Sequence, residues 1–145
     1  MLFIFVQSAM PGKISGAESS IIVQFVAGIT GWNEEILSVI VRKAAHFTEY
    51  MILGICLSIN MQDLRLKRIA DGTADTDEPV RNYLLAAWAA ALLYAMTDEI
   101  HQFFVPERVC AFTDVCIDSA GAACGILIYC ACMRIDSERT QKTRS

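Results

Sequence analysis

The chain has 145 residues, a length that fits one domain. Its hydrophobic fraction is 54% and its charged fraction is 19%, whereas soluble domains have roughly 45–50% and about 25%. The charges crowd into short stretches and leave long uncharged runs, as a bilayer requires, so the composition indicates an integral membrane protein. A net charge of −4 argues against a nucleic-acid-binding surface.

Two segments precede the first long apolar stretch. Residues 1–10 are apolar and end at Pro11 and Gly12, but a membrane span needs about 20 residues. No Lys/Arg-rich start typical of a signal peptide is present. We interpret residues 1–10 as the end of a truncated first membrane helix, with an interfacial segment as the alternative. Residues 13–30 carry apolar residues at helical spacing, which predicts an amphipathic helix lying in the membrane interface.

Three further stretches have the length and hydrophobicity of membrane-spanning helices, at residues 44–61, 83–104 and 114–133. The helix that contains the first of them begins after Asn33, a good N-cap residue. The sequence therefore predicts an all-α fold, a polytopic transmembrane bundle with three full spans and the truncated first one. We expect residues 1–145 to form a single membrane domain.

The connections between these spans are polar and set the expected orientation. We predict that residues 62–81 form a loop and that Thr113 or Asp114 caps the last span. We expect the charged tail from Arg134 to be frayed. Cytoplasmic loops of membrane proteins are enriched in Lys and Arg. One side holds Arg65, Lys67, Arg68, Arg81, Arg134, Arg139, Lys142 and Arg144, and the other holds Lys13, Arg42, Lys43 and Arg108. We therefore predict a multi-pass protein of the cell membrane with both termini in the cytoplasm.

Most polar residues of the spans lie at the ends that antiparallel threading brings to the extracytoplasmic leaflet. This predicted cluster comprises Arg42, His46, Glu49 and Tyr50 on the first full span, Tyr94, Asp98, Glu99, His101 and Gln102 on the second, Arg108 after it, and Asp114 and Asp118 on the third. Gly121 and Gly125 continue the face of Asp118, so another backbone can approach there. Each charge at membrane depth costs about 2.5–3.5 kcal/mol, so we expect the cluster either to function or to lock the helices together.

An acid–base enzyme, as a hydrolase or transferase, is one interpretation of the cluster. Histidine beside a carboxylate is a common general base. The candidate catalytic residues are His46, Glu49, Asp98, Glu99 and His101. The candidate substrate-binding residues are Arg42, Tyr50, Gln102, Arg108, Asp114 and Asp118, with the two arginines suited to a phosphate or carboxylate.

Two other classes of function stay open at this point. A divalent metal such as zinc or manganese could be held by two histidines with carboxylates, and the residues for it are His46, His101, Asp98 and Asp118. Alternatively, the protein is non-catalytic and either binds an anion through Arg42, Lys43 and Arg108 or interacts with other proteins. In a purely structural version of this reading, the cluster only holds the helices together.

Three blocks of the sequence resemble the VanZ-like family. Residues 42–50 (RKAAHFTEY) resemble its RKxxHFxEY opening, residues 94–108 (YAMTDEIHQFFVPER) its YAxxDEIHQxFVPxR block, and residues 114–121 (DVCIDSAG) its closing DVxxDxxG. Residues 3–8 are similar to the end of that family's first helix. One departure is Glu107, where the family usually has Gly. The resemblance implies a polytopic bacterial envelope protein associated with resistance to the glycopeptide teicoplanin, and it implies no molecular activity. An outward-facing cluster would then fit a target in the cell envelope. An enzyme would act on an envelope lipid or a cell-wall precursor, and a binder would hold an anionic lipid headgroup, a glycopeptide or another envelope protein.

Overall fold

The protein is all-α in the residues described by the computed structural model, which are 23–29, 31–104 and 111–144, with side chains up to Ile135. Three long helices follow a short helical stretch at residues 23–29, and they are α3 (Glu34–Ala70), α4 (Val80–Phe103) and α5 (Phe112–Arg144). The all-α prediction is confirmed. The predicted partial span at residues 1–10 and most of the predicted amphipathic helix lie outside the described residues.

Helix α3 begins where the sequence predicts and ends later. The side chain of Asn33 accepts a hydrogen bond of 2.8 Å from the backbone N–H of Glu35. This is the N-cap interaction that a short polar side chain provides. The helix then continues to Ala70, so the predicted loop at residues 62–81 was wrong in its first half. Its polar residues support a helix instead, because they pair one turn apart, as Asp63 and Lys67 do at 3.5 Å.

The turn between α3 and α4 is fixed by side chains of α3. Arg65 donates hydrogen bonds to the backbone oxygens of Thr76 and Glu78. Arg68 donates to the Tyr83 hydroxyl at 3.1 Å, and that hydroxyl donates to Glu78 at 2.8 Å. These bonds tie the two helices together at the end opposite the predicted cluster.

Helix α5 also departs from the sequence prediction at both ends. It begins at Phe112, so Thr113 and Asp114 lie in its first turn and neither is the cap residue. It runs to Arg144, so the prediction of a frayed tail from Arg134 was wrong. The charged tail residues are mostly good helix formers, and α5 carries the helix onward from its apolar part.

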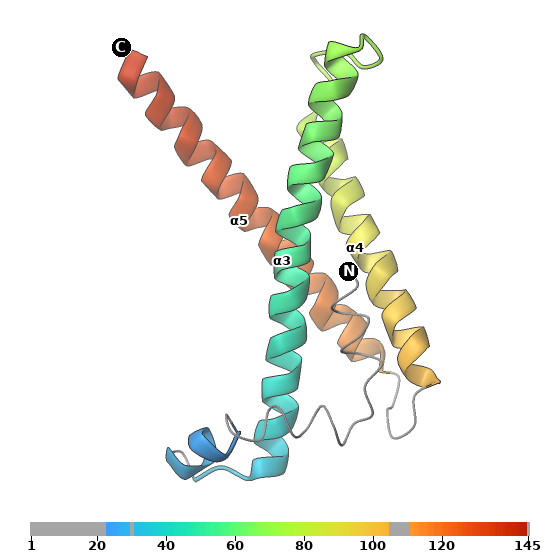
Figure 1. The fold of residues 1–145 in the computed structure, drawn as a ribbon, viewed down its shortest axis with the longest axis vertical. Coiled ribbons are helices and arrows are strands. Elements are labelled where there is room, and N and C mark those ends of the chain that lie inside the picture. The colour runs from blue at the N-terminus through green and yellow to red at the C-terminus, as the bar shows by residue number, and fades with distance from the viewer. Residues whose placement is uncertain (1–22, 30, 105–110, 145) are drawn as a thin grey trace.

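Figure 1 shows how the helices assemble: α4 runs antiparallel beside α3, and α5 crosses α3 near its middle. Glycine makes the crossing possible, since a Cβ on Gly121 or Gly125 would overlap the α3 backbone at Phe47 or Met51. This confirms the close approach that the sequence predicts at Gly121 and Gly125. From the other side, a Cβ on Gly54 would overlap the backbone of α5. The start of α3, the end of α4 and the start of α5 thereby meet at one end of the molecule.

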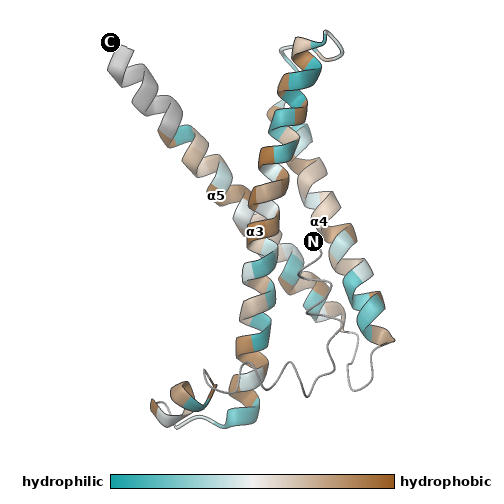
Figure 2. Ribbon diagram, in the orientation of Figure 1, coloured by the Kyte–Doolittle hydropathy of each residue, from teal (hydrophilic) through white to brown (hydrophobic). Residues whose placement is uncertain are grey.

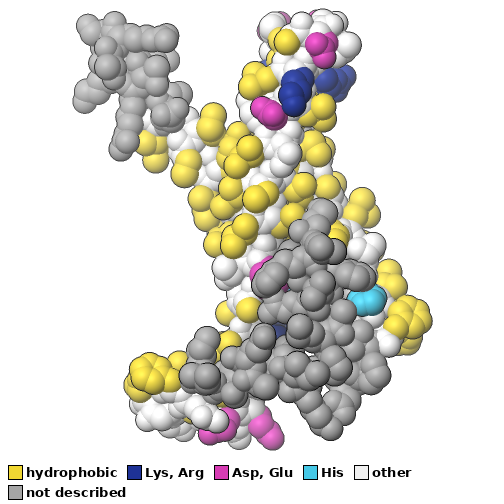
Figure 3. Space-filling view, viewed as in Figure 1, with side chains coloured by type: hydrophobic (Ala, Val, Ile, Leu, Met, Phe, Trp, Pro, Cys, Tyr) yellow, Lys and Arg dark blue, Asp and Glu magenta, His cyan; other side chains and the backbone are white. Residues whose placement is uncertain are grey.

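Apolar residues are concentrated over the middle of the molecule on the face shown, and the Lys and Arg side chains visible there lie mainly at the end where α3 and α4 join (Figures 2 and 3). In the described part of the chain, α5 alone contains a segment that passes as a membrane span on length and composition. This segment is Phe112–Ile135, with 24 residues, a mean hydropathy of 1.8 and 28% of the tested window buried. Charged residues interrupt the apolar runs of α3 and α4, and Asp98 and Glu99 do so in α4.

Candidate functional site

Polar side chains from three helices are buried together where the ends of the helices meet. The fully buried members are Tyr50 on α3, Asp98, Glu99 and Gln102 on α4, and Asp118 on α5, with exposures of 0%, 2%, 3%, 6% and 2%. His46, Glu49, Tyr94, His101 and Asp114 are half-buried. We call these ten residues the polar cluster. Buried carboxylates are rare in proteins unless they are paired with another group or take part in binding or catalysis.

An ion pair links the start of α3 to the start of α5 in the polar cluster. The ammonium group of Lys43 contacts Asp114, and both side chains are about one-third exposed, at 35% and 33%. Arg42, for which the sequence predicts the anion-binding role, is exposed. Among the described residues, the cation with a recorded ion pair to the cluster is Lys43, the neighbour of Arg42. The RK pair in the sequence gave no signal for choosing between the two, because they are adjacent.

Two hydrogen bonds hold the acids of α4. Gln102 donates to Asp98 at 3.0 Å, one turn back along the helix. Glu99 accepts a hydrogen bond of 3.0 Å from the backbone N–H of Ala111, the residue before α5. From the sequence, Glu99 is expected only to flank the helix face that carries Tyr94, Asp98, His101 and Gln102. In the structure it is buried and joins α4 to the entry of α5.

Two polar atoms at the centre of the cluster keep unused hydrogen-bonding capacity. The hydroxyl of Tyr50 and one carboxylate oxygen of Asp118 are buried and have no hydrogen-bond partner among the residues that the structure describes. The ring of Tyr50 packs against Tyr94, with ring centroids 6.1 Å apart. The carboxylates of Asp98 and Glu99 act electrostatically on both Tyr50 and Asp118. Buried polar atoms are normally satisfied, and among the described residues these two oxygens retain the capacity for a further hydrogen bond.

The remaining predicted residues have mixed outcomes. Arg108 lies outside the described residues. Both histidines are half-buried members of the cluster, and His101 lies in the last turn of α4. Within the described ranges, no three His, Cys, Asp or Glu side chains lie close enough together to hold a metal ion. The geometry thus gives no support to the metal interpretation there, and it groups acids with histidine, tyrosine and amide donors.

The sequence model of the family described as VanZ/LLP1 matches residues 1–133, nearly the whole chain. The chain belongs to the VanZ/LLP1 family. This confirms the resemblance that the three sequence blocks carry, and all three blocks lie within the matched residues. No curated protein and no solved structure matches the chain.

The ion pair between Lys43 and Asp114 makes a first prediction. We expect Lys43→Met to lower the free energy of unfolding by about 1 kcal/mol, the upper range for a partly exposed pair. The loss arises because Asp114 is left among other carboxylates without its cation. Denaturant unfolding in detergent measures the change. Lys67→Met is the matched control, since its pair with Asp63 is 72% and 67% exposed. Equal effects of the two variants would contradict a role for Lys43 in assembling the cluster.

Proposed function

We propose that this VanZ/LLP1 protein is a multi-pass membrane protein whose polar cluster binds the head of an envelope lipid or lipid-linked cell-wall precursor. Exposed apolar side chains on all three helices support the multi-pass arrangement, since soluble proteins rarely expose so much apolar surface. They include Ile52 and Ile59 on α3, Leu85 and Leu93 on α4, and Leu127 and Ile128 on α5. With 24 residues, even α4 has a length of about 36 Å, enough to cross a hydrocarbon core of about 30 Å.

The proposed orientation follows the basic residues. Lys and Arg are concentrated around the turn between α3 and α4 and in the tail of α5, which supports a cytoplasmic location for both. The polar cluster then faces the extracytoplasmic leaflet, where envelope lipids and precursors are exposed.

The observation that carries the binding proposal is the pair of buried, unsatisfied oxygens on Tyr50 and Asp118. Leaving such an atom unpaired costs about 1–3 kcal/mol. A ligand that donates a hydrogen bond to Asp118 and exchanges one with Tyr50 would recover this free energy.

The charge of the cluster narrows the chemistry of that ligand. Glu49, Asp98, Glu99 and Asp114 all act electrostatically on Asp118. A bare phosphate would be repelled there, whereas a hydroxyl or an ammonium group would be attracted. We assign the sugar hydroxyls or the amine of the headgroup to the buried acids. The phosphate of an anionic lipid fits the edge of the cluster, where the partly exposed Lys43 contacts Asp114. Arg42, one residue earlier on α3, is exposed.

The two histidines support an acid–base hydrolase or transferase as a second candidate function. His46 and His101 are half-buried members of the polar cluster, and a histidine paired with a carboxylate can take a proton from a bound hydroxyl and return it to a leaving group. Turnover of a bound precursor by purified protein, lost in His46→Gln or His101→Gln, would distinguish catalysis from binding.

The variant Asp118→Asn tests the binding proposal. It keeps the size of the side chain and removes its charge, so we expect at least about tenfold weaker binding, or about 1.4 kcal/mol. The probe is a polyprenyl-diphosphate-linked disaccharide titrated against protein in nanodiscs. We expect the melting temperature to stay equal or rise, since the variant relieves repulsion among buried acids at a functional site. Asp63→Asn, on the exposed ion pair of α3, is the control.

The opposite result would support a purely structural cluster. If the acids only lock the helices, Asp118→Asn lowers the melting temperature and leaves probe affinity unchanged.

A further inference from the structure

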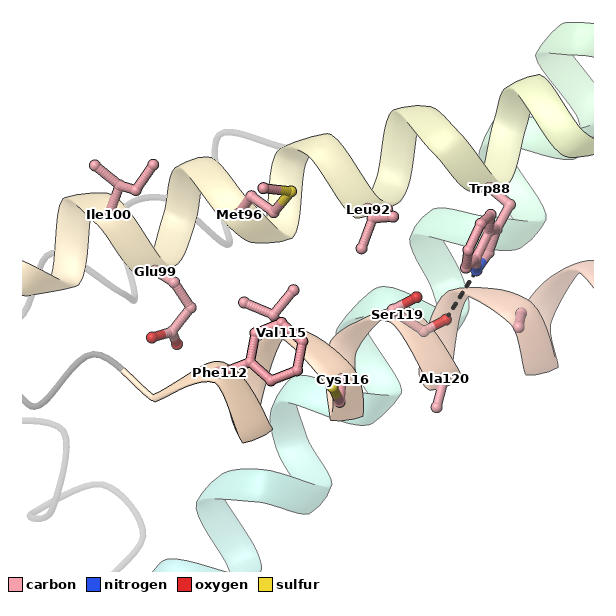
Figure 4. Close-up of a pocket in the computed structure, with 11 residues that line it drawn as sticks. Trp88, Leu92, Met96, Glu99, Ile100, Phe112, Val115, Cys116, Ser119 and Ala120 are labelled. Carbon is pink, nitrogen blue, oxygen red and sulfur yellow. Dashed lines mark hydrogen bonds between the residues drawn. The ribbon is translucent and has the colours of Figure 1, made fainter.

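An apolar groove runs along the outside of the molecule between α4 and α5, with a volume of about 660 Å³. Figure 4 shows its lining, with Leu92 and Met96 from α4 facing Val115 and Phe112 from α5. Trp88 closes one end, where its indole N–H donates to the backbone oxygen of Ser119 at 3.4 Å. The opposite end reaches the polar cluster.

Among the described residues that line the groove, Glu99 alone is charged. This carboxylate is 3% exposed and is held by the backbone N–H of Ala111, so it belongs to both the groove and the polar cluster. The groove is therefore continuous with the cluster. A molecule that fills both would have a polar head at Glu99 and an apolar body extending toward Trp88.

The length of the groove matches one leaflet of a bilayer. From Trp88 to Ile100, its lining follows α4 over twelve residues, which corresponds to about 18 Å of helix. Half of a hydrocarbon core of about 30 Å is about 15 Å. A hydrocarbon chain whose headgroup lies at the cluster would reach the bilayer midplane near Trp88.

We propose that the α4–α5 groove holds one hydrocarbon chain of the membrane lipid whose head lies in the polar cluster. The proposal rests on the proposed function, because the cluster supplies the site for the head. The hydrophobic effect gives a hydrocarbon chain in a bilayer no driving force to move from other lipids into the groove, so the groove must bind the chain through van der Waals packing. Its concave wall gives a chain more dispersion contacts than a flat helix surface does, and it thereby orients the lipid toward the cluster.

The variant Ala120→Phe tests the groove directly. Ala120 lines the groove and is itself exposed, so a phenyl ring there fills the groove without entering the core. The probe is phosphatidylglycerol in nanodiscs. Native mass spectrometry counts the lipid molecules that each protein molecule retains after it is released from the nanodisc. We expect about tenfold less retained lipid, corresponding to about 1.4 kcal/mol. The matched control is Ala86→Phe, which adds the same ring to an exposed position of α4 outside the groove.

A second measurement separates this proposal from the function of the cluster. A chain-free disaccharide diphosphate should bind Ala120→Phe as tightly as the native protein, and Asp118→Asn more weakly. Loss of lipid in Ala120→Phe with no binding of the chain-free head by any variant would support the groove and overturn the proposed function. Unchanged lipid retention in Ala120→Phe would overturn the groove proposal. A shift of Ala120→Phe from dimer to monomer would also overturn it, because the groove would then hold a second copy of the protein. A fall in melting temperature without loss of lipid would overturn it as well, because the groove would then hold another segment of the same protein.

Discussion

Replacing Gly125 by alanine is expected to separate α5 from α3 and to lower the free energy of unfolding by about 3 kcal/mol. The added Cβ would overlap the backbone oxygen of Met51, and backbone atoms of a helix cannot rotate away as a side chain can. The two helices must then move apart at their crossing. The polar cluster depends on this crossing, because Asp118 lies two helical turns before Gly125 and meets α3 beside it. We therefore expect probe binding to be lost together with stability.

Thermal unfolding in detergent, followed by circular dichroism, measures the effect of Gly125→Ala. Gly28→Ala is the control, because a Cβ on that helical glycine would meet nothing within 4 Å. The control should change stability by less than about 1 kcal/mol, in the stabilising direction, since alanine favours a helix more than glycine does. A Gly125→Ala protein as stable as the control would mean that α3 and α5 do not cross in contact at this glycine.

The helices and their crossing were predictable because local chemistry decides them. Asn33 followed by two acids is a strong signal for a helix start, and the spacing of Gly121 and Gly125 is a strong signal for close packing. The ends at Ala70 and Arg144 were not predictable in the same way. Polar residues read equally well as a loop or as a solvated helix, and contacts such as those of Arg65 with the turn decide between them.

The composition of the polar cluster was also largely predictable, whereas its internal contacts were not. Helical periodicity puts Glu49, Tyr50, Asp98 and Asp118 on faces that can meet once the helices run antiparallel. Choosing Lys43 over Arg42 requires the rotation of α3 about its own axis, which one residue changes by 100°. The role of Glu99 at the entry of α5 depends on a backbone N–H from a loop, and side-chain patterns carry no information about such a partner. The groove between α4 and α5 was missed for a related reason, since its lining is ordinary apolar helix surface.

Labelling of single cysteines from opposite sides of the membrane is expected to give an all-or-none result for the proposed topology. With the six native cysteines replaced by serine or alanine and the melting temperature checked against the native protein, Glu34→Cys and Thr113→Cys should react with a membrane-impermeant maleimide on intact cells. Asp75→Cys should react only after permeabilisation. All three positions are exposed. Helix α3, with 37 residues, has a length of about 55 Å and separates Glu34 from Asp75 by more than a hydrocarbon core of about 30 Å.

The pattern of labelling decides more than the number of crossings. Reaction of Glu34→Cys and Thr113→Cys from outside would put the shared end of α3 and α5, and hence the polar cluster, in the extracytoplasmic leaflet with access to cell-wall precursors. The inverse pattern would keep the multi-pass bundle and move the cluster to the cytoplasmic leaflet, where the lipid must be one made on that side. Reaction of all three cysteines from the same side would contradict the multi-pass arrangement itself. The exposed apolar faces of α3 and α4 would then need a protein partner in place of lipid, because water cannot cover them without a large free-energy cost.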